Sequence, residues 1–330
     1  MAQQTRRELL TGIAPRDELV NVPEFEAEAQ RVLAADRFRL LAGGDRALFE
    51  RITFRPRMMV NCVDLSLAVD LFGMPLFAPI LVGPVSEHGR FHADGELATV
   101  RGAAAGKAAV VVSSQSSLPL TAIAAAASTP LLFQTFAADG AAKVRAQAQD
   151  AERAGCKVIL VTLDAPEGGG RRVPRPDWNV VEAVRDAVSV PMVVKGVVTP
   201  QDAVAAVARG AHGVVVSNHG RVATPGQASP LEVVSPIVAA VGPQIPVLVD
   251  GGIRRGSDVM KALASGARAV LVARPIMWGL AAYGAEGVQA VVELLQTELA
   301  RVMGCCGTPN LAAITHRVVR LHAATPPPTA

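Results

Sequence analysis

His219 is the residue of this chain best suited to proton transfer, because it stands where a buried strand is expected to end. The apolar run Val214-Val215-Val216 is followed at once by Ser217-Asn218-His219-Gly220. An imidazole at the tip of a strand can act as a general acid or base near neutral pH. A lone histidine is more often a structural residue. The tips of the other strands therefore decide between the two interpretations.

The other apolar, β-branched runs of the chain also end in polar residues or glycines. These tips are Gly83-Pro84-Val85-Ser86, Ser113-Ser114, Gln134-Thr135-Phe136, Thr162 with Asp164, Lys195-Gly196, Asp250-Gly251-Gly252-Ile253-Arg254 and Ala273-Arg274-Pro275. Stability requires only that the strand interiors are apolar. Polar tips on every strand therefore indicate that the strands share a binding site at their carboxyl ends.

Glycines and arginines at the last two tips are residue types that bind phosphate. Gly251 and Gly252 let backbone N–H groups approach an anion, while Arg254 and Arg274 add bidentate charge. Asp250 can accept a hydrogen bond from a hydroxyl group of the same ligand. The alternative is a glycine-rich turn flanked by solvated arginines.

The remaining tips suit a planar anionic ring and an acidic substrate. Lys195 can stabilise negative charge on a cofactor ring or an enolate, or it can form a structural salt bridge. Asp164 can orient His219 and stabilise its imidazolium form. Arg171 and Arg221 are cations suited to a substrate carboxylate. The side chains that can hydrogen-bond the edge of a heterocycle are Ser113, Gln134 and Thr162.

Eight apolar runs alternate with alanine-rich segments of helical spacing, and this alternation predicts an α/β fold, a (β/α)8 TIM barrel. A doubly wound open sheet is the alternative. The predicted strands are Pro79–Val82, Ala109–Ser113, Leu131–Phe136, Val158–Leu163, Met192–Val197, Val214–Ser217, Val247–Val249 and Val270–Val272. The clearest predicted helices are Glu96–Ala105, Ala141–Ala154, Pro200–Ala208 and Ser257–Ala264, with N-caps at Thr199-Pro200 and Ser257-Asp258.

Composition favours one large domain and a small-molecule ligand. The chain has 330 residues, and we expect an N-terminal helical extension over residues 1–70, a barrel over 71–320 and a disordered tail over 321–330. The net charge of +3, without basic runs interleaved with aromatic residues, argues against nucleic acid as a partner. No apolar run reaches membrane-spanning length. The four cysteines show neither metal-ligand spacing nor a disulfide pattern, which favours the cytoplasm and no metal site.

Several motifs together resemble the FMN-dependent α-hydroxy acid oxidase/dehydrogenase family, which includes glycolate oxidase, lactate oxidase and mandelate dehydrogenase. The matching stretches are Phe54-Arg55-Pro56-Arg57, Asp94-Gly95-Glu96, Val161-Thr162-Leu163-Asp164-Ala165-Pro166, Val194-Lys195-Gly196-Val197, Ser217-Asn218-His219-Gly220 and Asp250-Gly251-Gly252-Ile253-Arg254-Arg255-Gly256. The resemblance implies FMN as the cofactor, a small-molecule substrate and a homo-oligomer, a tetramer in the family.

The resemblance also implies a role for each matching residue. His219 is the implied catalytic base, Asp164 its partner, and Lys195 the cation beside the flavin ring. Arg171 and Arg221 are implied to bind the substrate carboxylate, although the family usually has one more residue between the histidine and the second arginine. The residues implied to contact FMN are Pro84, Val85, Ser86, Ser113, Gln134, Thr162, Lys195, Ser217, Asp250, Gly251, Gly252, Arg254, Ala273 and Arg274.

The chain departs from the family pattern at the substrate side. Phe38 and Phe136 stand where the family has tyrosines, and the connection at residues 172–177 is short where the family has a long lid. The expected reaction is oxidation of a 2-hydroxy acid to a 2-oxo acid. One alternative is an FMN-dependent biosynthetic oxidase acting on a bulkier or non-acid alcohol or amine. Another is a non-redox protein, either a flavin-binding relic or a barrel isomerase that binds a phosphorylated metabolite.

Overall fold

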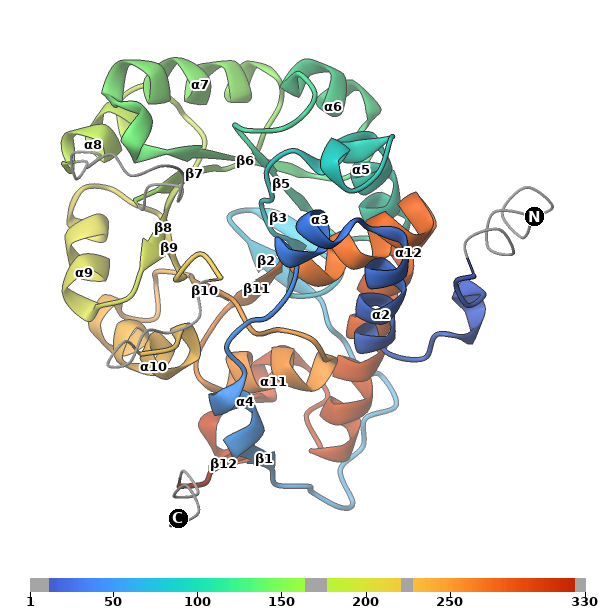
Figure 1. The fold of residues 1–330 in the computed structure, drawn as a ribbon. Coiled ribbons are helices and arrows are strands. Elements are labelled where there is room, and N and C mark those ends of the chain that lie inside the picture. Colours follow the sequence, from blue (N-terminus) through green and yellow to red (C-terminus); the bar gives the residue numbers. More distant parts are fainter. Residues whose placement is uncertain (1–11, 164–176, 221–227, 324–330) are drawn as a thin grey trace, which may run out of the picture.

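Eight parallel strands close into a barrel at the centre of the molecule (Figure 1). The computed structural model describes residues 12–163, 177–220 and 228–323. In chain order the barrel strands are β4 (Ile80–Val82), β5 (Val110–Ser113), β6 (Leu131–Phe136), β7 (Ile159–Thr162), β8 (Met192–Val197), β9 (Gly213–Val216), β10 (Val247–Asp250) and β11 (Ala269–Val272). Strand β11 pairs back with β4, which confirms the predicted barrel and excludes the open sheet.

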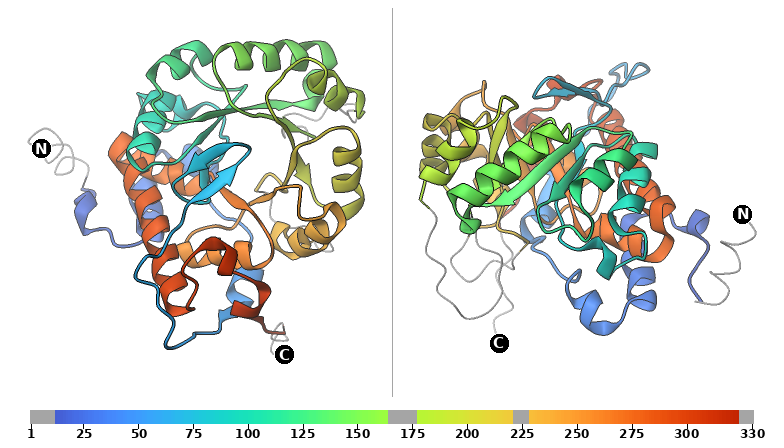
Figure 2. Two further views of the ribbon diagram at one scale, coloured as in Figure 1. Left: turned by 180° about the vertical axis from the view of Figure 1, so that it is seen from behind. Right: turned by 90° about the horizontal axis from the view of Figure 1, so that it is seen from above.

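The barrel strands are buried on both faces, which explains their continuous apolar sequences. Alternate residues of successive strands point into the barrel, among them Leu81, Val111 and Leu132, and pack into one cluster. Their neighbours along each strand pack against the surrounding helices in a second, larger cluster. The same internal cluster includes residues of the hairpin formed by β2 (Val69–Leu71) and β3 (Met74–Leu76). The hairpin therefore covers one end of the barrel, as the view from behind shows (Figure 2).

Helices surround the barrel and connect successive strands. They are α5 (Gly95–Ala105), α6 (Leu120–Ala126), α7 (Ala141–Arg153), α8 (Asn179–Arg185), α9 (Pro200–Ala208), α10 (Pro230–Val241), α11 (Gly256–Ala264) and α12 (Arg274–Cys305). Short 3-10 helices are η1 (Arg16–Glu18), η2 (His88–Arg90), η3 (Ala137–Asp139), η4 (Leu311–Ala313) and η5 (His316–Val318). None of the described helices combines the length and hydropathy that a bilayer crossing requires.

Two predicted N-caps have different outcomes. Thr199 caps α9, because its side chain accepts a hydrogen bond from the backbone N–H of Asp202. The cap predicted at Ser257 is wrong, because α11 already begins at Gly256. The carboxylate of Asp258, inside the first turn, accepts the backbone N–H groups of Arg254 and Arg255 and thereby replaces a side-chain cap.

The N-terminal segment is joined to both the barrel and the C-terminal part of the chain. It contains α2 (Val22–Val32), α3 (Ala35–Arg39), α4 (Ala47–Arg51) and β1 (Ile52–Phe54), and β1 pairs antiparallel with β12 (Val319–Leu321). Helix α2 packs on α12. The segment between α3 and α4, residues 40–46, passes the carboxyl ends of β10 and β11 (Figure 1). The domain boundaries at residues 70 and 320 stay predictions.

Candidate active site at the carboxyl ends of the strands

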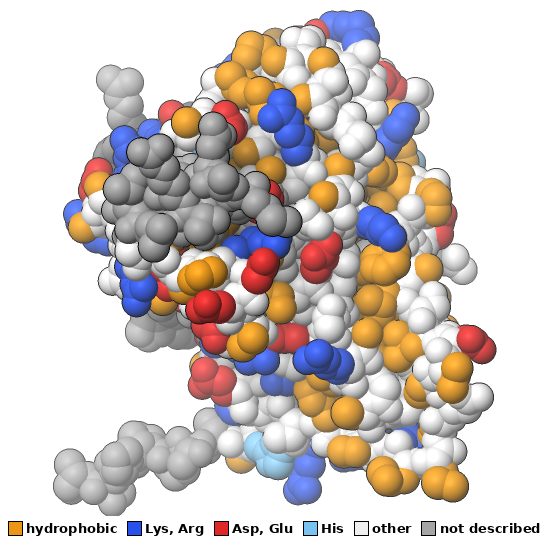
Figure 3. Space-filling model, turned by 90° about the vertical axis from the view of Figure 1, so that its right-hand side faces the viewer, with side chains coloured by type: hydrophobic (Ala, Val, Ile, Leu, Met, Phe, Trp, Pro, Cys, Tyr) orange, Lys and Arg blue, Asp and Glu red, His pale blue; other side chains and the backbone are white. Residues whose placement is uncertain are grey.

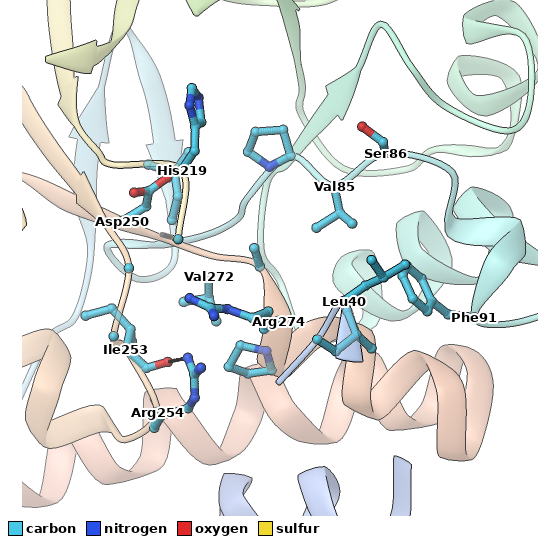
Figure 4. Close-up of a pocket in the computed structure, with 18 of the residues that line it drawn as sticks. Leu40, Val85, Ser86, Phe91, His219, Asp250, Ile253, Arg254, Val272 and Arg274 are labelled. Atoms are coloured by element: carbon cyan, nitrogen blue, oxygen red, sulfur yellow. Dashed lines mark hydrogen bonds between the residues drawn. The ribbon is translucent and has the colours of Figure 1, made fainter. Parts of the chain in front are cut away.

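A cavity of about 360 Å³ lies at the carboxyl ends of the barrel strands (Figure 4). Its walls come from the loop after β4, the end of β8, the loops after β9 and β10, and the start of α12. The predicted site residues that line it are Pro84, Val85, Ser86, Lys195, His219, Asp250, Gly251, Gly252, Arg254, Ala273 and Arg274. The folded chain therefore brings together five of the predicted tips, which lie far apart in the sequence.

Four predicted FMN contacts lie outside the cavity wall. Gln134 and Thr162 hydrogen-bond to each other, with 2.8 Å between the amide nitrogen and the hydroxyl oxygen, and both are buried. Ser113 is buried at the end of β5. Ser217 lies behind the wall, where its hydroxyl accepts hydrogen bonds from the Lys195 ammonium group at 2.9 Å and from the backbone N–H of His219 at 3.2 Å. Ser217 thus orients two residues of the cavity.

Lys195 forms a buried ion pair with Asp250, with 3.0 Å between Nζ and Oδ2. Lys195 therefore forms a salt bridge, as one of its two predicted roles required. It can also stabilise charge on a ligand, because Lys195 and Asp250 both line the cavity. The other carboxylate oxygen of Asp250 is buried and has no hydrogen-bond partner within the described residues. A buried acceptor of this kind normally has a partner, so Asp250 can accept a ligand hydroxyl.

His219 adopts a left-handed backbone conformation with φ of 57° at the end of the loop after β9. Such a conformation costs a non-glycine residue roughly 1–3 kcal/mol and is typical of functional sites. Figure 4 shows the imidazole pointing away from Arg254 and Arg274. The base and the basic corner of the cavity are therefore separated.

Arg254 and Arg274 form the basic corner. Arg254 donates to the carbonyl oxygens of Ile253 at 2.9 Å and Gly43 at 2.8 Å, and its guanidinium carbon lies 4.6 Å from the centre of the Trp278 ring. Burial, followed by the charge of Arg274, lowers the pKa of Arg254 to about 10. Burial also lowers the pKa of Arg274. The charge of Glu26 acts in the opposite direction on both arginines, raising the pKa of each.

Glycines shape the backbone around this corner. Gly252 has φ of +72°, and a Cβ atom there would lie 2.4 Å from the carbonyl oxygen of Asp45. A Cβ atom on Gly220 would lie 3.0 Å from a terminal nitrogen of Arg274. Both positions have positive φ, which favours glycine. The backbone N–H of Gly220 donates to the side chain of Asn218 at 3.1 Å. The basic corner, the glycines and the open oxygen of Asp250 fit the phosphate and the polyhydroxyl chain of FMN.

Only some of the residues predicted to act on the substrate lie within the described parts of the chain. Phe38 lies in α3 and Phe136 at the end of β6, and neither lines the cavity. Asp164, Arg171 and Arg221 lie outside the described residues, as does most of the short connection at residues 172–177. Among the described residues, His, Cys, Asp and Glu side chains do not gather in a group that could hold a metal ion.

Several lining residues were not predicted from the sequence. They are Leu40, Leu41, Glu87, Arg90, Phe91, Leu271 and Val272. Glu87, Leu271 and Val272 directly adjoin predicted tips, whereas Arg90 and Phe91 lie further along the loop after β4. Leu40 and Leu41 come from the N-terminal segment, and no sequence signal indicated that this segment reaches the strand ends.

Comparisons with known proteins agree with this site. A sequence profile described as FMN-dependent dehydrogenase matches residues 40–173 and 169–321. A peroxisomal (S)-2-hydroxyacid oxidase of Arabidopsis thaliana is 33% identical, with 92% of this chain and 97% of the relative aligned. A 4-hydroxymandelate oxidase of Amycolatopsis orientalis is 35% identical, with 89% of this chain and 96% of the relative aligned.

Solved structures of mandelate oxidase share the fold. The complex with (S)-2-phenylpropionate has a TM-score of 0.84 and 36% identity, covering 92% of this chain and 98% of that one. A mandelate oxidase variant with a C4a-OH-FMN adduct has a TM-score of 0.83 and 36% identity, covering 91% of this chain and 100% of that one. The predicted resemblance is confirmed, and with it FMN as the cofactor and an oxidoreductase activity. The chain belongs to the FMN-dependent dehydrogenase family.

Proposed function

We propose that this protein uses FMN to oxidise a 2-hydroxy acid to the corresponding 2-oxo acid. The observation that carries the proposal is a single cavity that combines a histidine, a buried Lys–Asp pair and a basic, glycine-lined corner. Relatives named as hydroxy acid, lactate and 4-hydroxymandelate oxidases support the substrate class.

The residues of this cavity divide into those that hold FMN and those that act on the substrate. Arg254, Arg274 and the backbone at Gly252 would hold the phosphate, and Asp250 the ribityl chain. Lys195 would stabilise negative charge on the ring. Bound FMN supplies a two-electron acceptor, which none of the amino-acid side chains provides.

His219 accepts the proton that the substrate must lose on oxidation. Its position in the cavity suits this role, because the imidazole points away from the two guanidinium groups of the basic corner (Figure 4). By resemblance, Asp164 orients His219, while Arg171 and Arg221 bind the substrate carboxylate. Gln134, Thr162, Ser113 and Ser217 support the ring and the base from behind the wall.

The substrate is proposed to carry a large apolar side chain. Leu40 and Phe91 form an apolar part of the cavity on the side away from His219 and Asp250 (Figure 4). Phe38 and Phe136 lack the hydroxyl groups that tyrosines would offer to a carboxylate. This lack favours, as a second candidate, a bulkier or non-acid alcohol or amine on the same fold.

The protein is also proposed to be a cytoplasmic homo-oligomer, a tetramer by resemblance. All four cysteines are free, which suits a reducing compartment. The loop between β1 and β2 exposes Met58, Met59 and Val63, the first at 86% and the second at 101% of their surfaces. Figure 3 shows further hydrophobic side chains along the right-hand side of one face of the molecule. Such patches favour association, and light scattering measures the subunit number.

Anaerobic reduction of the bound flavin tests the proposal. We expect mandelate-like or aliphatic 2-hydroxy acids to bleach the visible flavin band of the wild-type protein. His219→Ala should retain FMN and lose at least about 100-fold in reduction rate, because general-base catalysis contributes about 10²–10⁴-fold. His212→Ala is the matched control, since His212 lies before β9 at the opposite end of the barrel.

The possible results of this experiment distinguish the substrate class, the role of His219 and the place of FMN. A flavin band that no 2-hydroxy acid bleaches, but that an alcohol or amine does, selects the second candidate. Reduction of the His219→Ala protein at the wild-type rate would remove this residue from the role of base. A colourless protein that takes up no added FMN would contradict the assignment of the basic corner.

A further inference from the structure

The loop after β4, residues 83–91, forms one wall of the FMN cavity and is held from behind. It contributes Pro84, Val85 and Ser86 to the lining. The next residue, Glu87, has a left-handed backbone with φ of 51°. A non-glycine residue keeps that conformation only where the surrounding contacts determine it. The contacts that do so identify residues outside the cavity that affect it.

Glu96 is the centre of these contacts. It lies in the first turn of α5, is only 3% exposed, and does not line the FMN cavity. Its Oε1 atom accepts the backbone N–H of His88 at 3.1 Å and that of Ser117 at 2.7 Å. The first N–H belongs to the loop after β4 and the second to the loop after β5. One carboxylate therefore joins two neighbouring loops at the carboxyl ends of the strands.

His88 forms the second connection. Its ring is buried, with 2.9 Å between Nδ1 and the hydroxyl oxygen of Thr99, and it hydrogen-bonds the backbone of Val85. The Thr99 hydroxyl in turn donates to the carbonyl oxygen of Gly95 in α5. The chain of contacts runs from a cavity-lining residue through His88 to the helix that carries Glu96.

Further hydrogen bonds join the same two loops. The Ser86 hydroxyl donates to the side chain of Gln115 at 2.9 Å, and the backbone N–H of Glu87 donates to the Gln115 carbonyl at 3.0 Å. The backbone N–H of Gly89 donates to the Ser117 hydroxyl at 2.8 Å. The two loops are therefore connected on both sides of Glu87.

We propose that Glu96 and His88 are positioning residues that fix the Val85-Ser86 wall against the flavin without touching flavin or substrate. This inference rests on the proposed function, because it assigns the wall to the FMN site. A buried carboxylate is costly, and the N-terminus of α5 and two backbone N–H groups offset that cost here. Oε2 of Glu96 has no partner within the described residues, so the role belongs to Oε1.

FMN titration of the full-length apoprotein tests the proposal, with flavin fluorescence for affinity and the visible band for the surroundings of the ring. Glu96→Ala should weaken FMN binding about tenfold, the change expected for one lost hydrogen bond to a charged group, and should shift the band. Glu96→Gln retains Oε1 and should restore both properties. Wild-type affinity and spectrum in Glu96→Ala, or no rescue by Glu96→Gln, would overturn the proposal.

Glu152→Ala is the matched control. Glu152 also accepts two backbone N–H groups of one loop, those of Ser189 and Val190, but this loop precedes β8 at the opposite end of the barrel. The control should leave FMN affinity unchanged. An equal loss in Glu152→Ala would mean that general destabilisation, and not positioning of the wall, explains the effect.

Amide hydrogen exchange of the full-length apoprotein provides a readout that does not depend on FMN or turnover. We expect Glu96→Ala to accelerate exchange in residues 83–91 and 113–117 only, and His88→Gln to accelerate exchange in residues 83–91. Unchanged exchange in these loops would overturn the positioning role even if no 2-hydroxy acid is oxidised. Failure of the wild-type protein to oxidise any substrate would instead contradict the proposed function alone.

Discussion

Four buried or largely buried charged residues belong to the cavity or lie behind its wall. Lys195 and Asp250 pair within the wall, Arg254 is buried against Trp278, and Glu96 lies behind the loop after β4. Removing one partner of such a pair is more destabilising than replacing both, because a single buried charge remains. Variants of this site therefore need a stability measurement beside every activity measurement.

His88 should make the stability of the protein depend on pH. Burial lowers the pKa of His88 from 6.5 to about 4, although the Glu96 charge and the hydrogen bond with Val85 act in the opposite direction. Between about pH 6.5 and about pH 4 the unfolded chain binds a proton that the folded chain does not, so the free energy of unfolding falls as the pH falls. Urea unfolding at pH 7 and pH 5 measures the change.

His88→Gln removes the titrating group and keeps a polar side chain of similar size. The free energy of unfolding of this variant should fall less between pH 7 and pH 5 than that of the wild-type protein. His316→Gln is the control, because His316 is exposed and belongs to a 3-10 helix away from the cavity. Equal slopes in wild-type and His88→Gln proteins would show that another group causes the pH dependence.

At the scale of elements, residues 40–46 and the loop after β10 fit closely against each other. Arg46 donates to the carbonyl oxygen of Gly252 at 2.5 Å and pairs with Asp258 at 2.9 Å. Arg274 donates to the carbonyl oxygen of Ala42 at 3.2 Å. The basic corner is thus completed by a segment from the other end of the sequence.

Gly252→Ala tests this fit. The new Cβ atom would lie 2.4 Å from the carbonyl oxygen of Asp45 and 2.6 Å from Phe49. We expect a loss of about 1–3 kcal/mol in the free energy of unfolding and weaker FMN binding, measured by urea unfolding and flavin fluorescence.

Gly242→Ala is a matched control for Gly252→Ala. Gly242 has a similar φ of +77°, but a Cβ atom there would meet nothing within 4 Å. The control carries only the backbone strain, so the difference between the two variants measures the steric overlap. If both variants lose the same stability and bind FMN equally, the close fit of the two segments has no energetic importance.

Barrel elements were predictable because burial imposes a simple pattern on them. A strand such as Ala269–Val272 is covered on both faces, so all its residues are apolar and its end is visible in the sequence. Leu40 and Leu41 were not predictable as lining residues, because their place depends on long-range contacts such as that between the Leu41 carbonyl and Trp278. The cap at Ser257 failed for a local reason, since Asp258 satisfies the same backbone groups.

At the scale of the whole molecule, binding of FMN should stabilise the fold. The cofactor cavity joins the loops after β4, β9 and β10 to α12 and the N-terminal segment, so unfolding destroys the site. A ligand that binds only the folded state adds about 2.7 kcal/mol at a free concentration of 100 times Kd. We expect Tm to rise by several degrees with added FMN, as measured by scanning calorimetry.

Riboflavin is the control ligand for this prediction. It lacks the phosphate, and therefore the proposed contacts of that group with Arg254 and Arg274, so the rise in Tm at equal concentration should be much smaller. Equal shifts with FMN and riboflavin would contradict the assignment of the basic corner to the phosphate.

The pairing of β1 with β12 has a consequence for biosynthesis. On the ribosome, Ile52–Phe54 emerges long before Val319–Leu321, its only strand partner in the described part of the chain. In the same way, Ala42 and Gly43 emerge before Arg274 and Arg254, whose guanidinium groups they contact. A nascent chain therefore cannot assemble the flavin site while translation is in progress up to residue 274. Cofactor insertion must therefore follow the synthesis of these late segments.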